Sequence, residues 1–283
     1  MKNWKNSIKT KLIMIIIFVI FIITTVTLIV SSFLNYKTTI STLKDTMAEV
    51  VKIASRRIQA EVDGDQRLIY MLSQNPIISD ISIPIEQRFA ELKDEAEIQG
   101  FIQYGMTDKD GFTSENGTDL SKSAYFQFCK TNKKSYVSDP IITGKDSAII
   151  ILAAPIIVDG SFEGVVFFCK DASSLSNVVA EIKVGEHGTA TILNKNGDAI
   201  AYPDYQFVLN KYNIQEEAKT NKELTELAKI EADMVAGNEG VKKYIYEGTK
   251  KYMAYTSIPN SSGWSIGISV LQSEFTGNMI QAI

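Results

Sequence analysis

Residues 12–34 form an uncharged apolar run, LIMIIIFVIFIITTVTLIVSSFL, and this run limits the possible folds more than any other feature. At a helical rise of 1.5 Å per residue it is long enough to cross a hydrocarbon core about 30 Å thick. A cleavable signal peptide is the alternative, because the run is N-terminal and follows a basic region. The apolar part of a signal peptide is only about 7–15 residues long and ends at a small-x-small site. We therefore expect a retained transmembrane helix at residues 12–34.

The charges that flank this run predict its orientation. No acidic residue precedes it, whereas four lysines do: Lys2, Lys5, Lys9 and Lys11. Positive residues favour the cytoplasmic side, so we expect a cytoplasmic N-terminus at residues 1–11, a single N-terminal span in the cell membrane and an extracytoplasmic body after Leu34. The chain has a formal charge of −4 and residues 1–34 carry +4, which leaves −8 on the body. This acidic balance, without a basic cluster, argues against a nucleic-acid partner.

Histidine and cysteine are too scarce for the common catalytic and metal sites. His187 is the only histidine and stands beside glycines in VGEHGTA, which is typical of a turn. Neither a zinc-ligand spacing nor a convincing catalytic triad can be built from it, so we expect no enzymatic activity, no metal and no cofactor. An extracytoplasmic domain could join Cys129 to Cys169, but two cysteines in a body of this size are no disulfide framework. We expect two buried free thiols.

A long helical pattern follows the apolar run. Apolar residues recur every three or four positions over residues 36–73, and no strong stop occurs before Asn75-Pro76. This spacing predicts one amphipathic helix, about 55 Å long, in a stalk segment at residues 35–75. Its apolar stripe fits either packing against the chain's own modules or a contact between two copies, and we expect a homodimer.

Two similar pentapeptides reveal an internal repeat. TDKDG at residues 107–111 and LNKNG at 193–197 each lie between strand-like runs, and Gly with Asn or Asp is typical of a hairpin turn. A calcium loop is the rival interpretation of the first, but Phe112 and Thr113 occupy positions where an EF-hand needs ligand oxygens. The turns therefore indicate two related antiparallel-sheet modules.

The periodicity around each turn is similar in the two halves. In the first, helical spacing at residues 85–98 and 123–130 flanks the strand FIQYGM and precedes two long apolar strands. In the second, a strand, a turn and a strand precede a predicted helix at residues 215–236, and three more strands follow. We predict an α+β fold with a distal module at residues 76–182 and a proximal module at residues 183–272.

Several motifs in order resemble a known sensor family. They are TDKDG, DLSKSAYF, YVSDPIITGKDSAIIILAAPI, GVVFFCKD, GTATILNKNGDAIAYPD and SSGWSIGISVLQSEF. From residue 36 onward the chain resembles the double Cache (dCache) extracytoplasmic sensor region of bacterial methyl-accepting chemotaxis receptors, which also occurs in some sensor kinases and diguanylate cyclases. The resemblance implies two tandem PAS-like (Cache) modules, of which the membrane-distal one binds a small ligand and the membrane-proximal one transmits the change.

The resemblance implies a pocket between the distal sheet and the short helix that carries Tyr125 and Phe126. Alternation along GVVFFCKD puts Phe167, Cys169 and Asp171 on one face, and a carboxylate beside aromatic rings suits an ammonium or hydroxyl group. The alternative is that the aromatic residues are core and that Asp171 caps the next helix. The expected ligand-binding residues are Tyr104, Ser123, Tyr125, Phe126, Ile141, Thr143, Lys145, Cys169 and Asp171.

Two positions depart from the amino-acid-sensing members of the family. Those members carry an Arg two residues before the first helix aromatic and a Tyr after the SDP turn, where this chain has Ser123 and Ile141. In those members the Arg binds the ligand carboxylate, and an Asp pairs with the ligand amino group. This chain lacks the Arg but retains the Asp, as Asp171. We therefore expect an amine, a nucleobase-like ring or another small polar metabolite. For an acidic ligand, Lys145 is the residue that supplies a positive charge.

The C-terminal segment at residues 273–283, SEFTGNMIQAI, has the pattern of a helix that begins to lead into a second span. We expect a sensor piece of a longer receptor, rather than a truncated product, that acts on downstream signalling proteins through a cytoplasmic region. The sensor region of a histidine kinase or diguanylate cyclase is the alternative, because a sensing module does not fix the output. A lesser alternative is an anchored surface protein with no signalling role.

Overall fold

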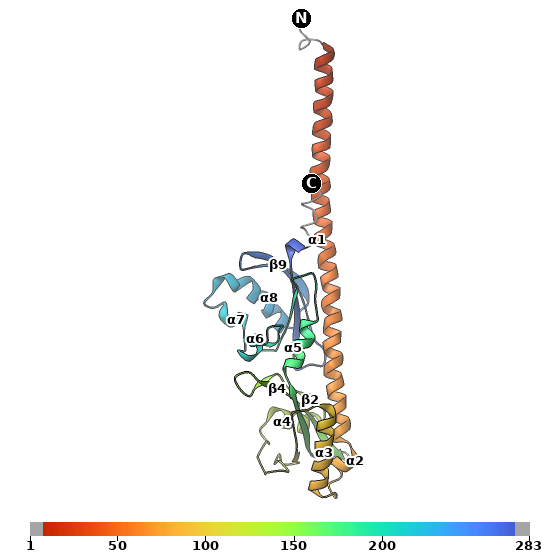
Figure 1. Cartoon of the computed structure of the whole chain (residues 1–283), viewed down its shortest axis with the longest axis vertical. Coiled ribbons are helices and arrows are strands. Elements are labelled where there is room, and N and C mark those ends of the chain that lie inside the picture. Colours follow the sequence, from red (N-terminus) through yellow and green to blue (C-terminus); the bar gives the residue numbers. More distant parts are fainter. Residues whose placement is uncertain (1–7, 275–283) are drawn as a thin grey trace. The chain divides into compact units, whose positions relative to one another are not determined.

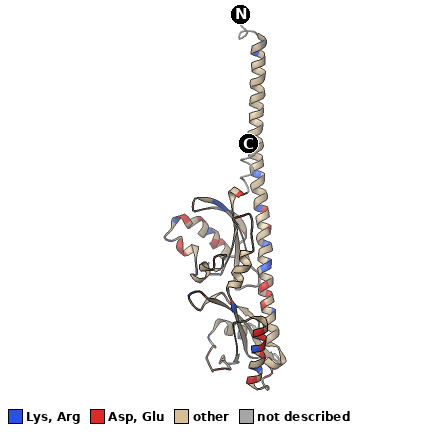
Figure 2. Cartoon of the chain, viewed as in Figure 1, with Lys and Arg blue, Asp and Glu red and all other residues tan. Residues whose placement is uncertain are grey.

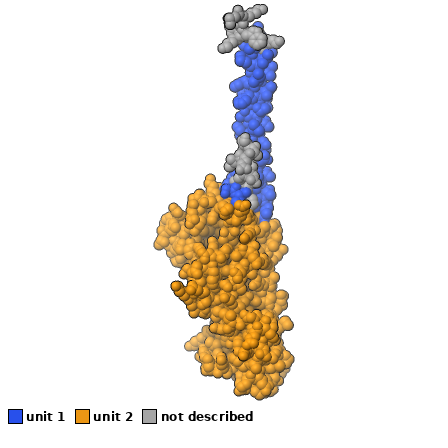
Figure 3. All heavy atoms as spheres, viewed as in Figure 1, with its two compact units in different colours: residues 1–46, 272–283 blue, residues 47–271 orange. Residues whose placement is uncertain are grey.

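The computed structural model describes residues 8–274 and divides the chain into two compact units (Figure 3). One comprises residues 1–46 and 272–283, and the other comprises residues 47–271. The predicted C-terminal helix falls almost entirely on residues 275–283, outside the described part. A single helix, α1 (Ile8–Ser73), begins in the first unit and ends in the second.

The first unit carries the apolar run on α1. No charged residue interrupts it (Figure 2), and its large apolar side chains are exposed. The hydroxyl groups of Thr24, Thr25 and Thr27 donate to carbonyl oxygens three or four residues earlier, at 2.8–3.0 Å. These three hydroxyl groups are thus satisfied inside the helix, as a hydrocarbon environment requires. By length and composition, α1 is the one helix among the described residues that can cross a membrane.

The second unit is built around the remainder of α1 (Figure 1). One face of the helix is buried against the modules: Met47, Val51, Ala54, Ile58, Val62, Ile69 and Leu72. The predicted stripe is correct as far as Val62, but beyond it the pattern placed Leu68 and Met71 on this face, and Met71 is 69% exposed. The amphipathic pattern over residues 36–73 thus correctly predicted a helix that ends at Ser73. In this part its stripe packs on the chain's own sheets.

The first module is a five-stranded antiparallel sheet in the order β1-β5-β4-β2, with β3 pairing with β4. Its strands are β1 (Gln103–Asp108), β2 (Tyr136–Val137), β3 (Ile141–Ile142), β4 (Ala148–Val158) and β5 (Ser161–Asp171). Its helices are α2 (Pro76–Ser79), α3 (Ile85–Gln99) and α4 (Ala124–Asn132), and α5 (Ser173–Ala180) follows the last strand.

The second module is another five-stranded antiparallel sheet, in the order β7-β6-β10-β9-β8. Its strands are β6 (Thr189–Leu193), β7 (Ala199–Ala201), β8 (Gly240–Tyr246), β9 (Thr249–Ser257) and β10 (Ser265–Leu271). Its helices are α6 (Gln206–Leu209), α7 (Ile214–Glu217), the 3-10 turn η2 (Lys222–Leu224) and α8 (Thr225–Val235). The α+β class with two antiparallel modules is therefore confirmed.

The two repeated pentapeptides form the same turn. Asp108 Oδ1 accepts from the backbone N–H groups two and four residues on, both at 2.9 Å, and Asn194 Oδ1 does the same at 2.9 and 3.0 Å. Gly111 and Gly197 close the turns with φ of 96° and 85°, a region that favours glycine. One difference was not predicted: the second turn leads into β7, whereas the chain after the first makes only isolated bridges.

The single helix predicted at residues 215–236 is wrong, because the structure breaks it into α7, η2 and α8. Asn221 lies in an extended conformation, and its side chain accepts from the backbone N–H of Glu223 at 3.1 Å. Such local bonds compete with helix formation. The interrupting stretch Lys219–Lys222 is also polar, so no apolar stripe holds it against the sheet.

The modules are joined to each other by a buried polar junction. Asp139, just after β2, accepts from Trp264 Nε1 at 2.6 Å and from Asn194 Nδ2 at 3.1 Å. Ser262 Oγ donates to the carbonyl oxygen of Val137 at 2.8 Å. Because Trp264 is fully buried, this junction fixes the turn at residues 193–197, in the proximal module, against the edge of the distal module.

Helix α1 also holds both modules. Ser55 Oγ donates to the carbonyl oxygen of Ser257 at the end of β9, at 2.7 Å. Further along, Lys170 of β5 forms ion pairs with Asp65 and with Glu61, the latter at 3.8 Å. One rigid element thus contacts the sheet of each module.

Candidate ligand-binding sites

The distal face is the side of the first sheet that α4 covers. Ser123 caps α4, because its Oγ accepts from the backbone N–H of Phe126, at 3.4 Å. The cap directs Tyr125 and Phe126 onto the sheet, where both are buried. The Tyr125 ring centroid lies 5.6 Å from that of Phe167, and Phe126 meets Phe162 edge-on at 5.7 Å. These aromatic residues form the buried end of the distal face.

Phe167 explains the glycine in β1. A Cβ placed on Gly105 would lie 2.4 Å from the tip of the Phe167 ring. The Phe167 ring therefore lies directly over Gly105 of β1, and no residue larger than glycine fits at that position. It also sets the depth of the distal face beside Tyr125.

Asp171 lies further along the same side of the sheet. Ile141, Ile149 and Asp171 are in register across β3, β4 and β5, and the next row on this face contains Cys169. Asp171 is exposed, and its Oδ1 accepts from the backbone N–H of Ser173 at 2.8 Å. The carboxylate thus binds the first backbone N–H of α5, and it lies four positions along β5 from Phe167, about 13 Å at 3.3 Å per residue.

The other expected residues do not join this group. Tyr104 pairs with Phe168, so its side chain lies on the opposite side of the sheet, where its ring is 5.7 Å from that of Phe89 on α3. Thr143 and Lys145 are exposed in the loop between β3 and β4. The structure therefore brings Tyr125, Phe126, Cys169, Ile141 and Asp171 to one face, with Ser123 at the cap of α4.

Both cysteines are buried and free, as the sequence predicted. Burial raises the pKa of the Cys129 thiol to about 12 and that of the Cys169 thiol to about 11. Neither thiol is therefore ionised near neutral pH, which makes both poor nucleophiles.

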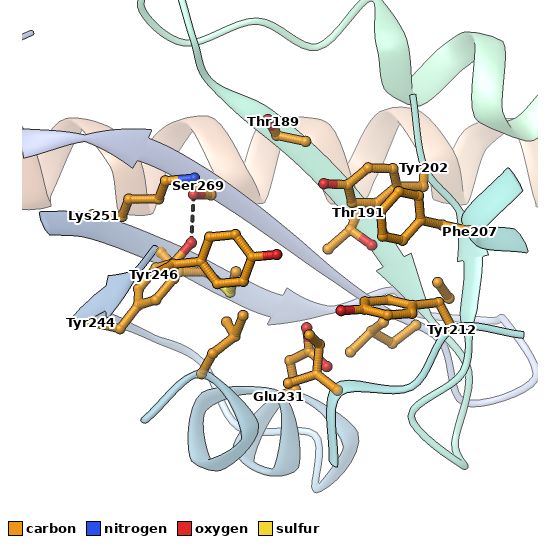
Figure 4. Close-up of a pocket in the computed structure, with 15 residues that line it drawn as sticks. Thr189, Thr191, Tyr202, Phe207, Tyr212, Glu231, Tyr244, Tyr246, Lys251 and Ser269 are labelled. Carbon is orange, nitrogen blue, oxygen red and sulfur yellow. Dashed lines mark hydrogen bonds between the residues drawn. The ribbon is translucent and has the colours of Figure 1, made fainter. Parts of the chain in front are cut away.

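A second candidate site lies in the proximal module, which we call the proximal cavity. It is a cavity of about 80 Å³ between the second sheet and helices α6 to α8 (Figure 4). The residues that line it come from all five strands of that sheet and from those helices and their loops: Thr189, Thr191, Leu193, Ala199, Tyr202, Phe207, Tyr212, Ile214, Leu227, Glu231, Tyr244, Tyr246, Lys251, Met253 and Ser269.

Aromatic rings form one wall of the proximal cavity. Tyr202 stacks on Phe207 at 4.5 Å, and Phe207 meets Tyr212 edge-on at 4.7 Å. On the opposite side stand Tyr244 and Tyr246, and the Tyr244 hydroxyl is 2.7 Å from Ser269 Oγ. In Figure 4 the hydroxyl groups of Tyr246 and Tyr212 point toward the space between the walls, whereas that of Tyr244 points to Ser269.

Glu231 is the most unusual group in the proximal cavity. It projects from α8 into the space between the aromatic walls (Figure 4), and only 5% of its surface is exposed. Its Oε2 is buried and has no hydrogen-bond partner among the described residues. Burial raises the pKa of this carboxyl to about 8. A buried, unpartnered carboxyl is rare in folded proteins because it costs free energy.

Two further charges lie near the proximal cavity. Lys251 Nζ stands over the Tyr246 ring, 5.1 Å from its centroid, and forms no ion pair with Glu231 in the described part of the chain. On the other side, Glu217 is exposed and accepts from the Tyr212 hydroxyl at 2.9 Å. The interior of the cavity therefore contains one carboxyl group and several ring faces.

The sequence pattern did not point to the proximal cavity, although it held one signal. Leu227, Ile230 and Met234 form the buried apolar side of α8, and Glu231 falls on the same side, four residues after Leu227. A charged residue inside a buried stripe departs from the amphipathic pattern and marks a position to explain.

The architecture is two tandem antiparallel sheet modules packed against one long helix. The chain matches the model of the Cache domain family, dCache_1, over residues 35–279 and belongs to that family. A search of curated proteins finds no significant match.

Solved structures with the same fold include several sensor domains. The ligand-binding domain of the Pseudomonas fluorescens chemoreceptor CtaA, in complex with L-serine, is 20% identical with a TM-score of 0.64, covering 82% of this chain and 99% of that one. That of the Pseudomonas aeruginosa PAO1 amino acid chemoreceptor PctC, in complex with GABA, is 16% identical with a TM-score of 0.63, covering 81% and 100%. An extracellular domain assigned to a histidine kinase, mmHK1S-Z3, is 15% identical with a TM-score of 0.63, covering 83% and 97%. At these identities the similarity shows the fold.

Proposed function

We propose that this chain is the extracytoplasmic ligand-sensing region of a transmembrane receptor. Residues 12–34 span the cell membrane, residues 1–11 are cytoplasmic, and both modules lie outside. The observation that carries the proposal is that α1 contains the apolar run and also contacts both sheets further along its length. A change in either module therefore acts on the same helix that enters the membrane.

The proposed ligand site is the distal face, in the module at residues 76–182. Tyr125 and Phe126 supply an apolar end, and Asp171 supplies a carboxylate for an ammonium or hydroxyl group. The face is linked to α1 through β5, because Lys170 follows Cys169 on that strand and points to the other side, where it pairs with Asp65. A ligand that shifts β5 would thus act on α1 directly.

The proposed ligand is a small amine, a nucleobase-like ring or another small polar metabolite. CtaA and PctC are chemoreceptors with L-serine and GABA bound in their structures, which supports a ligand of this size. Chemotaxis is the proposed output, through a homodimer and downstream signalling proteins. A kinase output is the second candidate, because the extracellular domain of mmHK1S-Z3, a protein assigned as a histidine kinase, shares the fold.

A ligand screen tests the distal site. The full chain in maltoside micelles is screened by thermal shift against amino acids, amines and nucleobases, and the affinity for the best ligand is measured by calorimetry. Asp171→Asn should weaken that affinity at least tenfold, since it removes a charge-assisted contact. Asp146→Asn, in the exposed loop after Lys145, is the matched control. The comparison uses a ligand whose affinity Glu231→Gln leaves unchanged, and equal affinity in Asp171→Asn and the parent would then refute the distal site.

A further inference from the structure

The proximal cavity is partly open to solvent, and its walls are already in place. At about 10–15 Å³ for each water-sized group, its 80 Å³ hold about five to eight such groups. That is the size of a small organic molecule rather than of a peptide or a nucleotide. Ring stacking and the bond between Tyr244 and Ser269 fix the walls. The cavity is therefore preformed rather than assembled around its occupant.

The chemistry of the walls favours a positively charged ligand. Aromatic rings present a negative face, which attracts cations at short range. Glu231 adds a carboxyl group that projects between the walls (Figure 4), and its buried Oε2 has no hydrogen-bond partner among the described residues. Lys251, the one cation among the lining residues, is held over the Tyr246 ring and does not neutralise Glu231. The missing partner of Glu231 is therefore a positive group from outside the chain.

We infer that the proximal cavity is a binding site for a small organic ammonium ion, which pairs with Glu231 between the aromatic walls. The ammonium donates to the carboxylate, and its alkyl part packs against apolar lining residues such as Leu227 and Met253. The site is in the proximal module, so it goes beyond the proposed function, which assigns a ligand to the distal face only.

Binding couples to the release of one proton. In the empty cavity burial holds the pKa of Glu231 at about 8, so the carboxyl group is mostly protonated at pH 7. The ammonium keeps its own proton, Glu231 loses its proton to the buffer, and the ion pair forms. Apparent affinity should therefore rise as pH approaches 8 and level off above it. From pH 6 to pH 8 the expected gain is about 50-fold, which is the ratio of the ionised fractions of Glu231.

The other groups around Glu231 do not titrate across this range in a way that mimics the effect. Burial is the first cause that raises the pKa of each lining tyrosine, so all four stay neutral to above pH 9: Tyr202, Tyr212, Tyr244 and Tyr246. The charged groups that remain are Lys251 on β9 and the exposed Glu217 on α7. Neither forms an ion pair with Glu231 in the described residues.

Calorimetry of the full chain in maltoside micelles tests the inference with n-propylammonium as the probe and 1-propanol as its neutral counterpart. We expect saturable binding of the probe at pH 8, about 50-fold weaker binding at pH 6, and release of about 0.9 proton at pH 7 when buffers of different ionisation enthalpy are compared. Glu231→Gln should abolish probe binding, whereas Glu223→Gln, exposed just before α8, should leave it within twofold.

Three outcomes would overturn the inference: no saturable heat from the probe at pH 8, equal affinity in Glu231→Gln, or tighter binding of 1-propanol than of the probe. The fluorescence of buried Trp264 verifies that each variant is folded. Asp171→Asn separates the two proposals: binding heat that it removes belongs to the distal face, and binding heat that Glu231→Gln removes belongs to the proximal cavity. Loss of all probe binding in Asp171→Asn would contradict an independent proximal site.

Discussion

Glu231 should make the empty protein less stable as the pH rises. The unfolded chain ionises this carboxyl near its ordinary pKa of 4.5, whereas burial holds its pKa at about 8 in the folded state. Between these values the folded state binds more protons than the unfolded state. The free energy of unfolding must therefore fall with rising pH over that window.

The size of the effect follows from the two pKa values. Each pH unit between them costs about 1.4 kcal/mol, so ionisation in the unfolded chain costs the native state about 3 kcal/mol at pH 7. Glu231→Gln removes the titration and keeps the shape of the side chain. The difference in the free energy of unfolding between the variant and the parent should therefore change by about 3 kcal/mol in favour of the variant from pH 4.5 to pH 7. A packing cost of the amide does not depend on pH, so it does not affect this change.

Urea unfolding of the full chain in maltoside micelles measures this difference. Trp264 reports the transition, in a background where Trp4, the other tryptophan, is replaced by phenylalanine. Glu223→Gln is the matched control and should show a difference from the parent that does not change with pH. If the difference between Glu231→Gln and the parent is also constant from pH 4.5 to pH 8, the carboxyl is not buried as described and the reasoning fails.

Three further predictions follow from the packing. Asp139→Ala leaves the Trp264 indole and an amide without their acceptor, so it should cost about 2–3 kcal/mol by urea unfolding; a loss below about 0.5 kcal/mol would show that the junction contributes little. Gly164→Ala places a Cβ 2.0 Å from a carbonyl oxygen of β1, at a φ of 154°, and should lower the melting temperature by at least 5 °C, whereas an unchanged value would contradict the β1–β5 pairing. Cys129 and Cys169 should react with a maleimide at pH 7 at least 100-fold more slowly than in urea, and equal rates would place them at the surface.

Features that depend on local chemistry could be predicted from the sequence. The spacing of apolar residues defined the buried face of α1, and the Asp or Asn with Gly in each pentapeptide defined both turns. These features are set by residues close together in the chain. Ser123, by contrast, was expected only as a ligand-binding residue, and its role as the cap of α4 was not predicted.

Features that depend on strand register or on packing could not be predicted from the sequence. Tyr104 lies on the side of the sheet away from Tyr125 because it pairs with Phe168, and a register shift of one residue would have reversed this. The break at Asn221 depends on one side-chain bond that competes with a helix. The proximal cavity depends on how the helices α6 to α8 fill the space over the sheet, which alternation and spacing do not encode.

The central claim is that ligand occupancy in a module changes its relation to α1. Nitroxide labels at Ile53 on α1 and Ile245 on β8, both exposed, report this relation by electron paramagnetic resonance on the full chain. With n-propylammonium bound at pH 8, we predict a shifted distance distribution in the parent and an unshifted one in Glu231→Gln. Identical distributions with and without the probe, while calorimetry shows that it is bound, would contradict the account.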